Sequence, residues 1–478
     1  METKDNFIVA IEIGSSKITG IAGRKQPDGA LQIMAAVQDR GASAFIRKGR
    51  INNLLKMTAC IKSIKDKLEK KLNRSITQAY IGIGGMGMHS ELNTVLKNFP
   101  EKTQISSSVV DSIQDENRQS QPAEREILQA IIQEYKLGAQ TTADPVGVPA
   151  ESIEGHFLNI ITRREAAETI QNCANEERLG VAGMPITVLA EADELLPESE
   201  RHSGCVFIDM GAETTSVCVF KNNILRHIAV IPLGGRNITK DIASLSIEEN
   251  EAEKLKLTYG RALYSDEELQ HEPIVTESGH QVAWDDFCNL VEARQEEIIK
   301  NILRQIELSK YDRSNLVGGL IITGGAASMP AIDKAFTKYT GFEKIQIKPA
   351  LPTIVRAGNI QGFNKDGSYN AAIALLLKGT ENCSGGDLGQ AQQDMFDEKK
   401  RKEEEERLKA EREAKEAQEA AEAQARKEAE EARAAQQAKE ERKRKRREGL
   451  LRRWNVFKNF ANNLVSDEDS KQDKDENS

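Results

Sequence analysis

The chain has 478 residues, enough for two or three domains with a substantial hydrophobic core. Its net charge of −9 argues against general nucleic-acid binding, and its six cysteines are scattered without C-x-x-C pairs, which indicates reduced thiols in a cytoplasmic protein. No stretch approaches the roughly 18 apolar residues of a membrane-spanning helix, and we expect no signal peptide.

The first predicted element is a β-hairpin in residues 7–23, "FIVAIEIGSSKITGIAG". Gly14 marks its turn, and Ser15 and Ser16 add hydroxyl groups beside backbone N–H groups, which suits a phosphate. Glu12 would repel a bare phosphate, so its position favours a divalent cation between them, with Mg²⁺ held partly through water. An ordinary hairpin explains this stretch, taken alone, equally well.

Apolar residues recur at helical spacing in residues 53–72, which predicts a helix. The following segment, "QAYIGIGGMGMHS", has the pattern of a strand that ends in a glycine turn. This alternation predicts an α/β architecture. A less regular insert follows at about 86–162, with the length of a small domain. We expect it to contact another molecule.

The hairpin pattern returns in residues 205–220, "CVFIDMGAETTSVCVF", with Asp209 before the Gly211 turn. Thr214 and Thr215 supply the hydroxyl groups here. Glu213 would add negative charge beside a phosphate unless its side chain points away. Two such loops in one chain are more specific for phosphate binding than either alone.

Two further segments with predicted elements follow the second hairpin. The segment "RHIAVIPLGGRNITKDIASLSIEENEAEKLKLTYG" predicts a strand, a Gly-Gly turn and two helices. Residues 318–330, "GGLIITGGAASMP", predict a strand that ends at Gly324 and Gly325. These glycines permit a flat ring or a phosphate to approach the backbone, as they permit any tight turn.

In this order the motifs resemble those of the actin, Hsp70 and sugar-kinase superfamily and, within it, the FtsA family of bacterial cell-division proteins. The resemblance implies a two-lobed actin-like ATPase fold of the α/β class with an inserted small α+β subdomain. It also implies that ATP and Mg²⁺ bind between the lobes, with Mg²⁺ held by Glu12 and Asp209. The implied nucleotide-binding residues are Glu12, Gly14, Ser15, Ser16, Lys17, Asp209, Gly211, Thr214, Thr215, Gly235, Glu253, Lys256, Gly324, Gly325 and Ala326.

Within that set, the resemblance places Glu253 and Lys256 on the helix that contacts ribose and adenine. Residues 324–326 correspond to the loop against the base or α-phosphate. Glu191 in "VLAEADELL" corresponds to the residue that positions the attacking water. We expect at most a slow ATPase, because the first loop has Glu12 where most members have Asp and the second loop has Ala212 and Glu213 where many have glycines.

The resemblance also implies domain boundaries. Subdomain 1A covers 5–85, 163–200 and 369–380; inserted subdomain 1C covers 86–162; subdomain 2A covers 201–232 and 320–368; subdomain 2B covers 233–319; a charged linker covers 381–447; and an amphipathic helix covers 448–466.

The linker is built almost only of Glu, Lys, Arg, Ala and Gln from Glu398 to about Lys445. Opposite charges at helical spacing favour a solvated single helix, and the lack of large apolar residues argues against a coiled coil. A disordered charged linker is the alternative.

The last segment, "EGLLRRWNVFKNFANNLVSDEDS", has an apolar stripe beside basic residues. Such a helix suits an anionic membrane surface, and it resembles the membrane-targeting helix of the FtsA family. A helix that docks in a protein groove is the alternative. The predicted membrane-binding residues are Leu450, Leu451, Arg453, Trp454, Phe457, Lys458, Phe460 and Leu464.

The resemblance implies a filament-forming adaptor that tethers FtsZ to the cytoplasmic face of the inner membrane at the division site. The FtsZ C-terminal peptide would bind residues 233–319, where Arg294 and Arg304 suit an acidic peptide or belong to a solvated helix face. Later division proteins would bind 86–162. The alternative is a sugar-kinase-like or acetate-kinase-like phosphotransferase, for which we locate no catalytic Asp.

Overall fold

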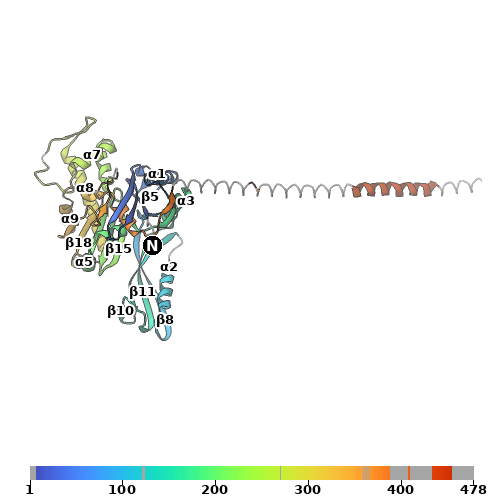
Figure 1. Cartoon of the computed structure of the whole chain (residues 1–478), viewed down its shortest axis with the longest axis horizontal. Helices are drawn as coiled ribbons and strands as arrows, with labels where there is room; N and C mark the ends of the chain where they lie inside the picture. Colours follow the sequence, from blue (N-terminus) through green and yellow to red (C-terminus); the bar gives the residue numbers. More distant parts are fainter. Residues whose placement is uncertain are drawn as a thin grey trace, which may run out of the picture. The chain divides into compact units, whose positions relative to one another are not determined.

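The two predicted hairpins are the central strands of two β-sheets with matching topology. The structure is a computed structural model of the chain that describes residues 7–120, 124–269, 271–358, 360, 363–364, 366–387, 407, 409 and 433–454. The chain divides into two compact units, Met1–Ala391 and Gln392–Ser478. The first unit holds both sheets (Figure 1).

In each sheet the first hairpin strand lies between its antiparallel partner and a parallel strand. Around the first hairpin the order is β7 (Gln78–Ile81), β1 (Ile8–Ile13), β2 (Ile18–Lys25) and β3 (Leu31–Asp39). Around the second hairpin the order is β18 (Gly319–Thr323), β13 (Cys205–Met210), β14 (Thr215–Lys221) and β15 (Ile224–Ile231). The strands β2 and β3, and likewise β14 and β15, are antiparallel. This repeat means that the residues just after β1 and just after β13 occupy equivalent places in the two sheets.

The first lobe is the six-stranded sheet β12-β7-β1-β2-β3-β20 with its helices. Its strands are β1 (Ile8–Ile13), β2 (Ile18–Lys25), β3 (Leu31–Asp39), β7 (Gln78–Ile81), β12 (Gly180–Gly183) and β20 (Val355–Arg356). Its helices are α1 (Leu54–Leu72), α3 (Arg164–Glu176), α4 (Thr187–Leu195) and α10 (Asn370–Lys378). Short elements are η1 (Ala42–Ala44), the hairpin β4 (Ile46–Arg47) and β5 (Arg50–Ile51), and the pair β6 (Arg74–Ile76) and β21 (Ser384–Asp387).

Helix α1 shows how the sequence sets an element in this lobe. The side chain of Asn53 accepts a hydrogen bond from the Lys56 N–H at 3.0 Å, and Asn73 ends the helix in the left-handed conformation. One face is buried at helical spacing, through Met57, Ile61, Ile64 and Leu68. The helix predicted at 53–72 is therefore confirmed.

The second lobe contains five strands of a nine-stranded sheet, in the order β15-β14-β13-β18-β19. Its strands are β13 (Cys205–Met210), β14 (Thr215–Lys221), β15 (Ile224–Ile231), β18 (Gly319–Thr323) and β19 (Ile345–Ile347). Its helices are α5 (Glu198–Ser203), α6 (Gly235–Ala243), α7 (Glu249–Tyr259), α8 (Trp284–Leu308), α9 (Ile332–Thr340) and the short η2 (Gly325–Ser328), with a small hairpin of β16 (Ile274–Val275) and β17 (Gln281–Val282).

The insert extends this sheet and is more regular than its sequence suggested. Its strands are β8 (His89–Gln104), β9 (Arg125–Leu137), β10 (Gln140–Thr142) and β11 (Pro149–Arg163), and its helix is α2 (Ser107–Gln119). These strands and α2 project together from the two lobes (Figure 1). Helix α2 covers a small separate core around Ile113, Ile153 and Phe157, whereas most side chains near the far end of β8 are exposed. Exposure alternates along the first part of β8, but Leu92 and Leu96 lie at exposed positions and Asn93 and Lys97 at less exposed ones, so apolar periodicity alone does not reveal this strand.

The second unit contributes a described helix at 433–454, where side chains are exposed throughout. Within the described part of the chain, no helix is long and apolar enough to cross a membrane. Most of the predicted linker lies outside the described residues. The domain boundaries that the resemblance implies stay predictions.

Candidate nucleotide site between two hairpins

The turns of the two hairpins have the same geometry. The Gly14 N–H donates to the Lys17 carbonyl at 3.0 Å, and the Gly211 N–H donates to the Thr214 carbonyl at 2.8 Å. A Cβ atom on either glycine would lie within 3 Å of the carbonyl that its own N–H binds. Both turns therefore need glycine, which explains why the same short pattern occurs twice in the sequence.

Three carboxyl groups from different elements influence one another at this place. Burial raises the pKa of Glu12 to about 7, and the charge of Asp209 adds to the shift. Burial raises the pKa of Asp209 to about 6. Burial also raises the pKa of Glu191 on α4 well above its ordinary value, and the charges of Asp209 and Glu12 add to it. The structure thus brings together the two predicted metal-linked residues and the predicted water-positioning residue.

These carboxyl groups suit a cation that keeps most of its own water. Oε2 of Glu191 is buried and has no hydrogen-bond partner among the described residues. Among those same residues, no group of three His, Cys, Asp or Glu side chains is placed to hold a metal ion. A cation there would need water or phosphate oxygens to complete its coordination shell. Mg²⁺ commonly binds in this way, with several water ligands kept.

The other polar residues of the first hairpin have different surroundings. Ser15 is buried, and its Oγ accepts a hydrogen bond from the Gly49 N–H at 3.0 Å. Ser16 is exposed. Nζ of Lys17 donates to the Ser368 carbonyl at 2.5 Å, and burial lowers its pKa although the charge of Glu12 opposes the shift.

The second hairpin is bound to the loop that starts α6. The hydroxyl of Thr215 is buried and donates to the Leu233 carbonyl at 2.9 Å, so this donor is already used within the protein, whereas Thr214 is only half-buried. The Gly235 N–H donates to the Gly211 carbonyl at 3.0 Å. A Cβ on Gly234 would lie 2.6 Å from the same carbonyl oxygen, so the close approach of this loop requires glycine there.

The predicted nucleoside residues meet beside Gly235. Nζ of Lys256 donates to Oε2 of Glu253 at 2.7 Å, to Oγ1 of Thr239 at 2.9 Å and to the Gly235 carbonyl at 3.2 Å. A Cβ on Gly235 would lie 3.2 Å from the Cβ of Ala326. Thr239 was not among the predicted residues, although its place one helical turn after Gly235 was a signal for it.

The glycines after β18 differ in what surrounds them. Gly324 has φ +93°, and a Cβ there would lie 2.4 Å from Oδ1 of Asp209, so this residue packs against the carboxyl cluster. A Cβ on Gly325 would meet no described atom within 4 Å. Gly325 is exposed and borders open space, and it directly follows the glycine that packs against Asp209 of the second hairpin.

Comparison with known proteins identifies the family. The model of the family described as "Cell division protein FtsA" matches residues 206–374, and that of the "SHS2 domain inserted in FTSA" matches residues 85–161. The chain belongs to the FtsA family. The FtsA of Porphyromonas gingivalis (strain ATCC BAA-308 / W83) is 28% identical over 393 residues, which cover 80% of each chain. The FtsA of Neisseria meningitidis serogroup B is 27% identical over 384 residues, covering 79% of this chain and 91% of the relative.

A solved structure agrees with this assignment at the level of fold. A chain in the PilM-PilN type IV pilus biogenesis complex matches with a TM-score of 0.55 and 14% identity, covering 78% of this chain and 98% of that chain. The predicted actin-like α/β fold with an inserted subdomain is therefore confirmed. The chain is a cell-division protein of the FtsA family.

A contact missed by the sequence analysis joins the second hairpin of this FtsA-family chain to the turn between β4 and β5. The side chain of Glu213 points away from its own turn, and its Oε2 accepts a hydrogen bond from the Lys48 N–H at 2.6 Å. Lys48 and Gly49 form the turn between β4 and β5, and both have positive φ. The motif "RKGR" at 47–50 was the signal for such a turn, because glycine favours this conformation.

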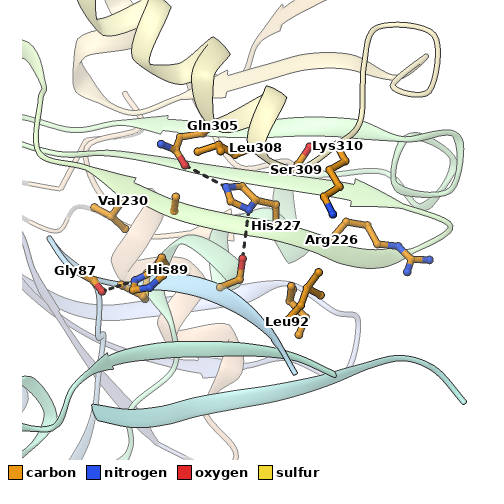
Figure 2. Close-up of a pocket in the computed structure, with 14 residues that line it drawn as sticks. Gly87, His89, Leu92, Arg226, His227, Val230, Gln305, Leu308, Ser309 and Lys310 are labelled. Atoms are coloured by element: carbon orange, nitrogen blue, oxygen red, sulfur yellow. Dashed lines mark hydrogen bonds between the residues drawn. The ribbon is translucent and has the colours of Figure 1, made fainter. Parts of the chain in front are cut away.

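A cavity of about 560 Å³ lies elsewhere, where the insert meets the second lobe (Figure 2). His227 points across it to Gln305, with 3.2 Å between Nε2 and Oε1, and burial lowers the pKa of His227. Leu92 of β8 and Leu308 of α8 also line the cavity. None of the predicted nucleotide-binding residues lines this cavity, so it is separate from the candidate nucleotide site.

The predicted peptide-binding arginines have partners within α6 and α8. Arg294 binds Asp241, with 3.0 Å between Nη2 and Oδ1, and also pairs with Glu297. Arg304 pairs with Glu307 at 3.0 Å, and both side chains are exposed. Arg304 is therefore more accessible to an acidic peptide than Arg294.

Of the predicted membrane-binding residues, four belong to the described helix at 433–454. Leu450, Leu451 and Trp454 are 62%, 52% and 60% exposed, and Arg453 is exposed as well. The other four, Phe457, Lys458, Phe460 and Leu464, lie outside the described residues.

Proposed function

We propose that this FtsA-family chain binds ATP with Mg²⁺ between its two hairpins. The observation that carries the proposal is the repeated turn, which places Glu12 and Asp209 at equivalent ends of two sheets and close enough for their charges to interact. One carboxyl group from each lobe is the arrangement that a bridging cation needs. The cation would neutralise phosphate charge that these groups otherwise repel.

The remaining predicted residues fit roles around this centre. The turn N–H groups beside Gly14 and Gly211, with Ser16 and Thr214, suit phosphate oxygens. Lys256, held by Glu253, suits the nucleoside together with the open space at Gly325. Glu191 would hold a water through its unpaired Oε2. Its raised pKa favours the neutral carboxyl, which is a poor proton acceptor, and this supports slow turnover at most.

The protein would act as an adaptor and not mainly as an enzyme. In this proposal it assembles into filaments, binds the C-terminal peptide of FtsZ on 233–319 and recruits later division proteins through 86–162. Membership of the FtsA family supports these roles, and the accessible Arg304 supports an acidic peptide ligand.

The C-terminal helix would hold these filaments on the cytoplasmic face of the inner membrane. Exposed Leu450, Leu451 and Trp454 beside Arg452 and Arg453 support a peripheral contact with anionic lipid. This contact needs no helix that spans the bilayer.

Co-sedimentation with liposomes tests the adaptor role. The full chain and a chain that ends at residue 447 are each mixed with anionic vesicles, with and without ATP and Mg²⁺. We expect only the full chain to pellet, and to pellet more with Mg-ATP because filaments bind through many tails at once. Equal pelleting of both chains would refute the membrane role of the tail, and neutral vesicles control for apolar binding alone.

A further inference from the structure

The strands β8 and β15 are neighbours in the nine-stranded sheet but separate almost at once. In the described part of the chain their register consists of one pair, Ala229 of β15 opposite His89 of β8. Strand β8 continues to Gln104 and pairs with β11 on its other side. Every second residue of an antiparallel strand points its N–H and C=O groups to a given side. Beyond His89, the edge of β8 that faces β15 is therefore free to pair with an added strand.

The cavity of about 560 Å³ lies where these two strands separate (Figure 2). His227 of β15 joins its two sides, with Nδ1 3.4 Å from Oγ of Ser90 on β8 and Nε2 3.2 Å from Oε1 of Gln305 on α8. Ser90 and Leu92 belong both to the cavity lining and to the free stretch of β8. A strand added along this edge would therefore place one of its ends in the cavity.

Two cations line the cavity without a carboxylate to balance them. Arg226 and Lys310 lie at the same end of the cavity (Figure 2), and no Asp or Glu is among the described residues that line it. Arg226 donates to two neutral acceptors, Oε1 of Gln133 at 3.0 Å and the Lys221 carbonyl at 3.4 Å. Within the described protein, Nη2 of Arg226 and Nζ of Lys310 make no hydrogen bond or ion pair. This end of the cavity therefore suits an anionic group, above all a carboxylate.

An apolar stripe leads from the cavity along β8. Leu92 and Leu96 are 70% and 52% exposed on one face of the strand, whereas Val95 on the opposite face is buried with Ile113 of α2. Leu92 lies opposite Leu158 of β11, which also lines the cavity. The two exposed leucines are four residues apart, a distance of about 13 Å along a strand. A stripe of this length suits an extended peptide better than a compact small molecule.

We propose that the free edge of β8 binds an acidic peptide segment of a partner protein as an added strand. Strand β8 is antiparallel to both of its neighbours, and the same direction for the added strand would place its C-terminal end in the cavity. A carboxylate there meets Arg226 and Lys310, and apolar side chains cover Leu92 and Leu96. Backbone pairing supplies affinity in this mode, and the side chains select the ligand.

This inference gives partner binding at the insert a site and a ligand chemistry, and to that extent it rests on the proposed function. The site is separate from the candidate nucleotide site, from the C-terminal helix and from Arg304, which does not line the cavity. Binding of a synthetic peptide to the full chain is therefore measured without ATP, lipid or another division protein. A failure of those proposed interactions would leave this measurement unchanged.

The probe is the peptide Thr-Leu-Thr-Leu-Thr-Leu-Asp-Asp, with fluorescein at its N-terminus and a free C-terminus. It has alternating apolar side chains and carboxylates at the end that would enter the cavity. The control peptide has two lysines in place of the aspartates and an amidated C-terminus. Fluorescence anisotropy measures the affinity, and hydrogen exchange measures whether the peptide protects the backbone of residues 90–97.

Three variants test the charge and the apolar stripe separately. Arg226→Gln and Lys310→Glu each remove one cation, and Leu92→Asn removes the apolar side chain nearest the cavity. Lys300→Glu on α8 and Leu257→Asn on α7 are the matched controls, because both residues are exposed and neither lines the cavity. Circular dichroism verifies that each variant is folded. Lys310→Glu is the safest variant, since the Lys310 side chain makes no hydrogen bond or ion pair within the described protein.

We expect the acidic peptide to bind and to slow exchange in residues 90–97. Arg226→Gln should weaken binding roughly tenfold, the effect of losing a hydrogen bond to a charged group. Lys310→Glu should weaken it roughly fivefold, because this pair is more exposed, and Leu92→Asn by a similar factor. The two control variants should bind as the unchanged chain does, and the lysine peptide at least roughly tenfold more weakly.

Three results would overturn the proposal. One is no binding of the acidic peptide up to about 1 mM, and another is equal binding of the acidic and lysine peptides or unchanged affinity in Lys310→Glu. The third is slower exchange in residues 90–97 as the protein concentration rises without peptide. That result would show that the edge of β8 pairs with a second copy of the chain.

Discussion

Replacement of Trp454 by Glu should release the protein from anionic membranes. The side chain is 60% exposed, which leaves roughly 150 Å² for burial when a whole Trp buries up to about 250 Å². At about 25 cal/mol per Å², burial of this surface contributes about 4 kcal/mol, or nearly three orders of magnitude in affinity. Burial at the headgroup boundary is incomplete, so we expect a loss of at least roughly tenfold.

Basic residues supply the second contribution to this binding. Arg446, Arg447, Arg452 and Arg453 belong to the same described helix, and each gains about 1 kcal/mol near an anionic surface. Neither the apolar nor the electrostatic contribution is large enough alone once the cost of ordering the helix is subtracted. Higher salt should therefore weaken binding of the unchanged chain without abolishing it.

Titration with vesicles measures the loss of membrane affinity. Bound protein is detected by a method that does not use tryptophan fluorescence, because the variant lacks Trp454. Trp454→Phe is the matched control and should keep most of the affinity, because it keeps an aromatic ring. If Trp454→Glu binds as tightly as the unchanged chain, or if that chain binds neutral and anionic vesicles equally, the apolar face of this helix is a protein-docking surface and the reasoning is wrong.

Three further predictions concern the first unit. Gly325→Arg should abolish ATP binding, measured by calorimetry, because the arginine would fill the open space beside the nucleoside residues while leaving the fold intact. Arg304→Glu should weaken the FtsZ C-terminal peptide by roughly tenfold in fluorescence anisotropy, and binding should weaken with salt; an unchanged affinity would exclude this helix face. The free energy of unfolding, measured with urea, should fall less between pH 7.5 and 5.5 in His227→Gln than in the unchanged chain. Burial in the folded state lowers the pKa of His227, so below about pH 6.5 the folded state binds fewer protons than the unfolded state and loses stability. A pH dependence identical to that of the unchanged chain would show that His227 takes up its proton equally in both states.

The sequence was sufficient for elements whose signals are local. Both hairpins, α1, and the strand before Gly324 follow from turn glycines and from apolar spacing over a few residues. The insert was harder, because β8 has an exposed far end and its apolar residues do not follow its exposure: Leu92 and Leu96 are exposed, whereas Asn93 and Lys97 are less so. Its long strands are held by pairing across about 60 residues of sequence, as where Thr94 pairs with His156.

The candidate site was predictable by residue type but not by partner. Glu12 and Asp209 are marked by the same spacing before a glycine, so the sequence reveals them. It does not reveal that Thr215 donates to Leu233, or that Glu213 accepts from Lys48, because these contacts depend on how the loops pack. The sequence likewise did not reveal that Arg294, a candidate for binding an acidic peptide, already pairs with Asp241, which lies 53 residues away in the chain.

Calorimetry of Mg-ATP binding to the Asp209→Ala variant is the most direct test of the nucleotide site between the hairpins. The account predicts that the unchanged chain binds Mg-ATP, and that the variant binds it at least roughly tenfold more weakly because one lobe no longer reaches the cation. Asp28→Ala, which removes an exposed carboxylate paired with Arg356, should bind as the unchanged chain does. Equal affinity of Asp209→Ala and the unchanged chain would contradict the account, since it would place the nucleotide away from the second hairpin.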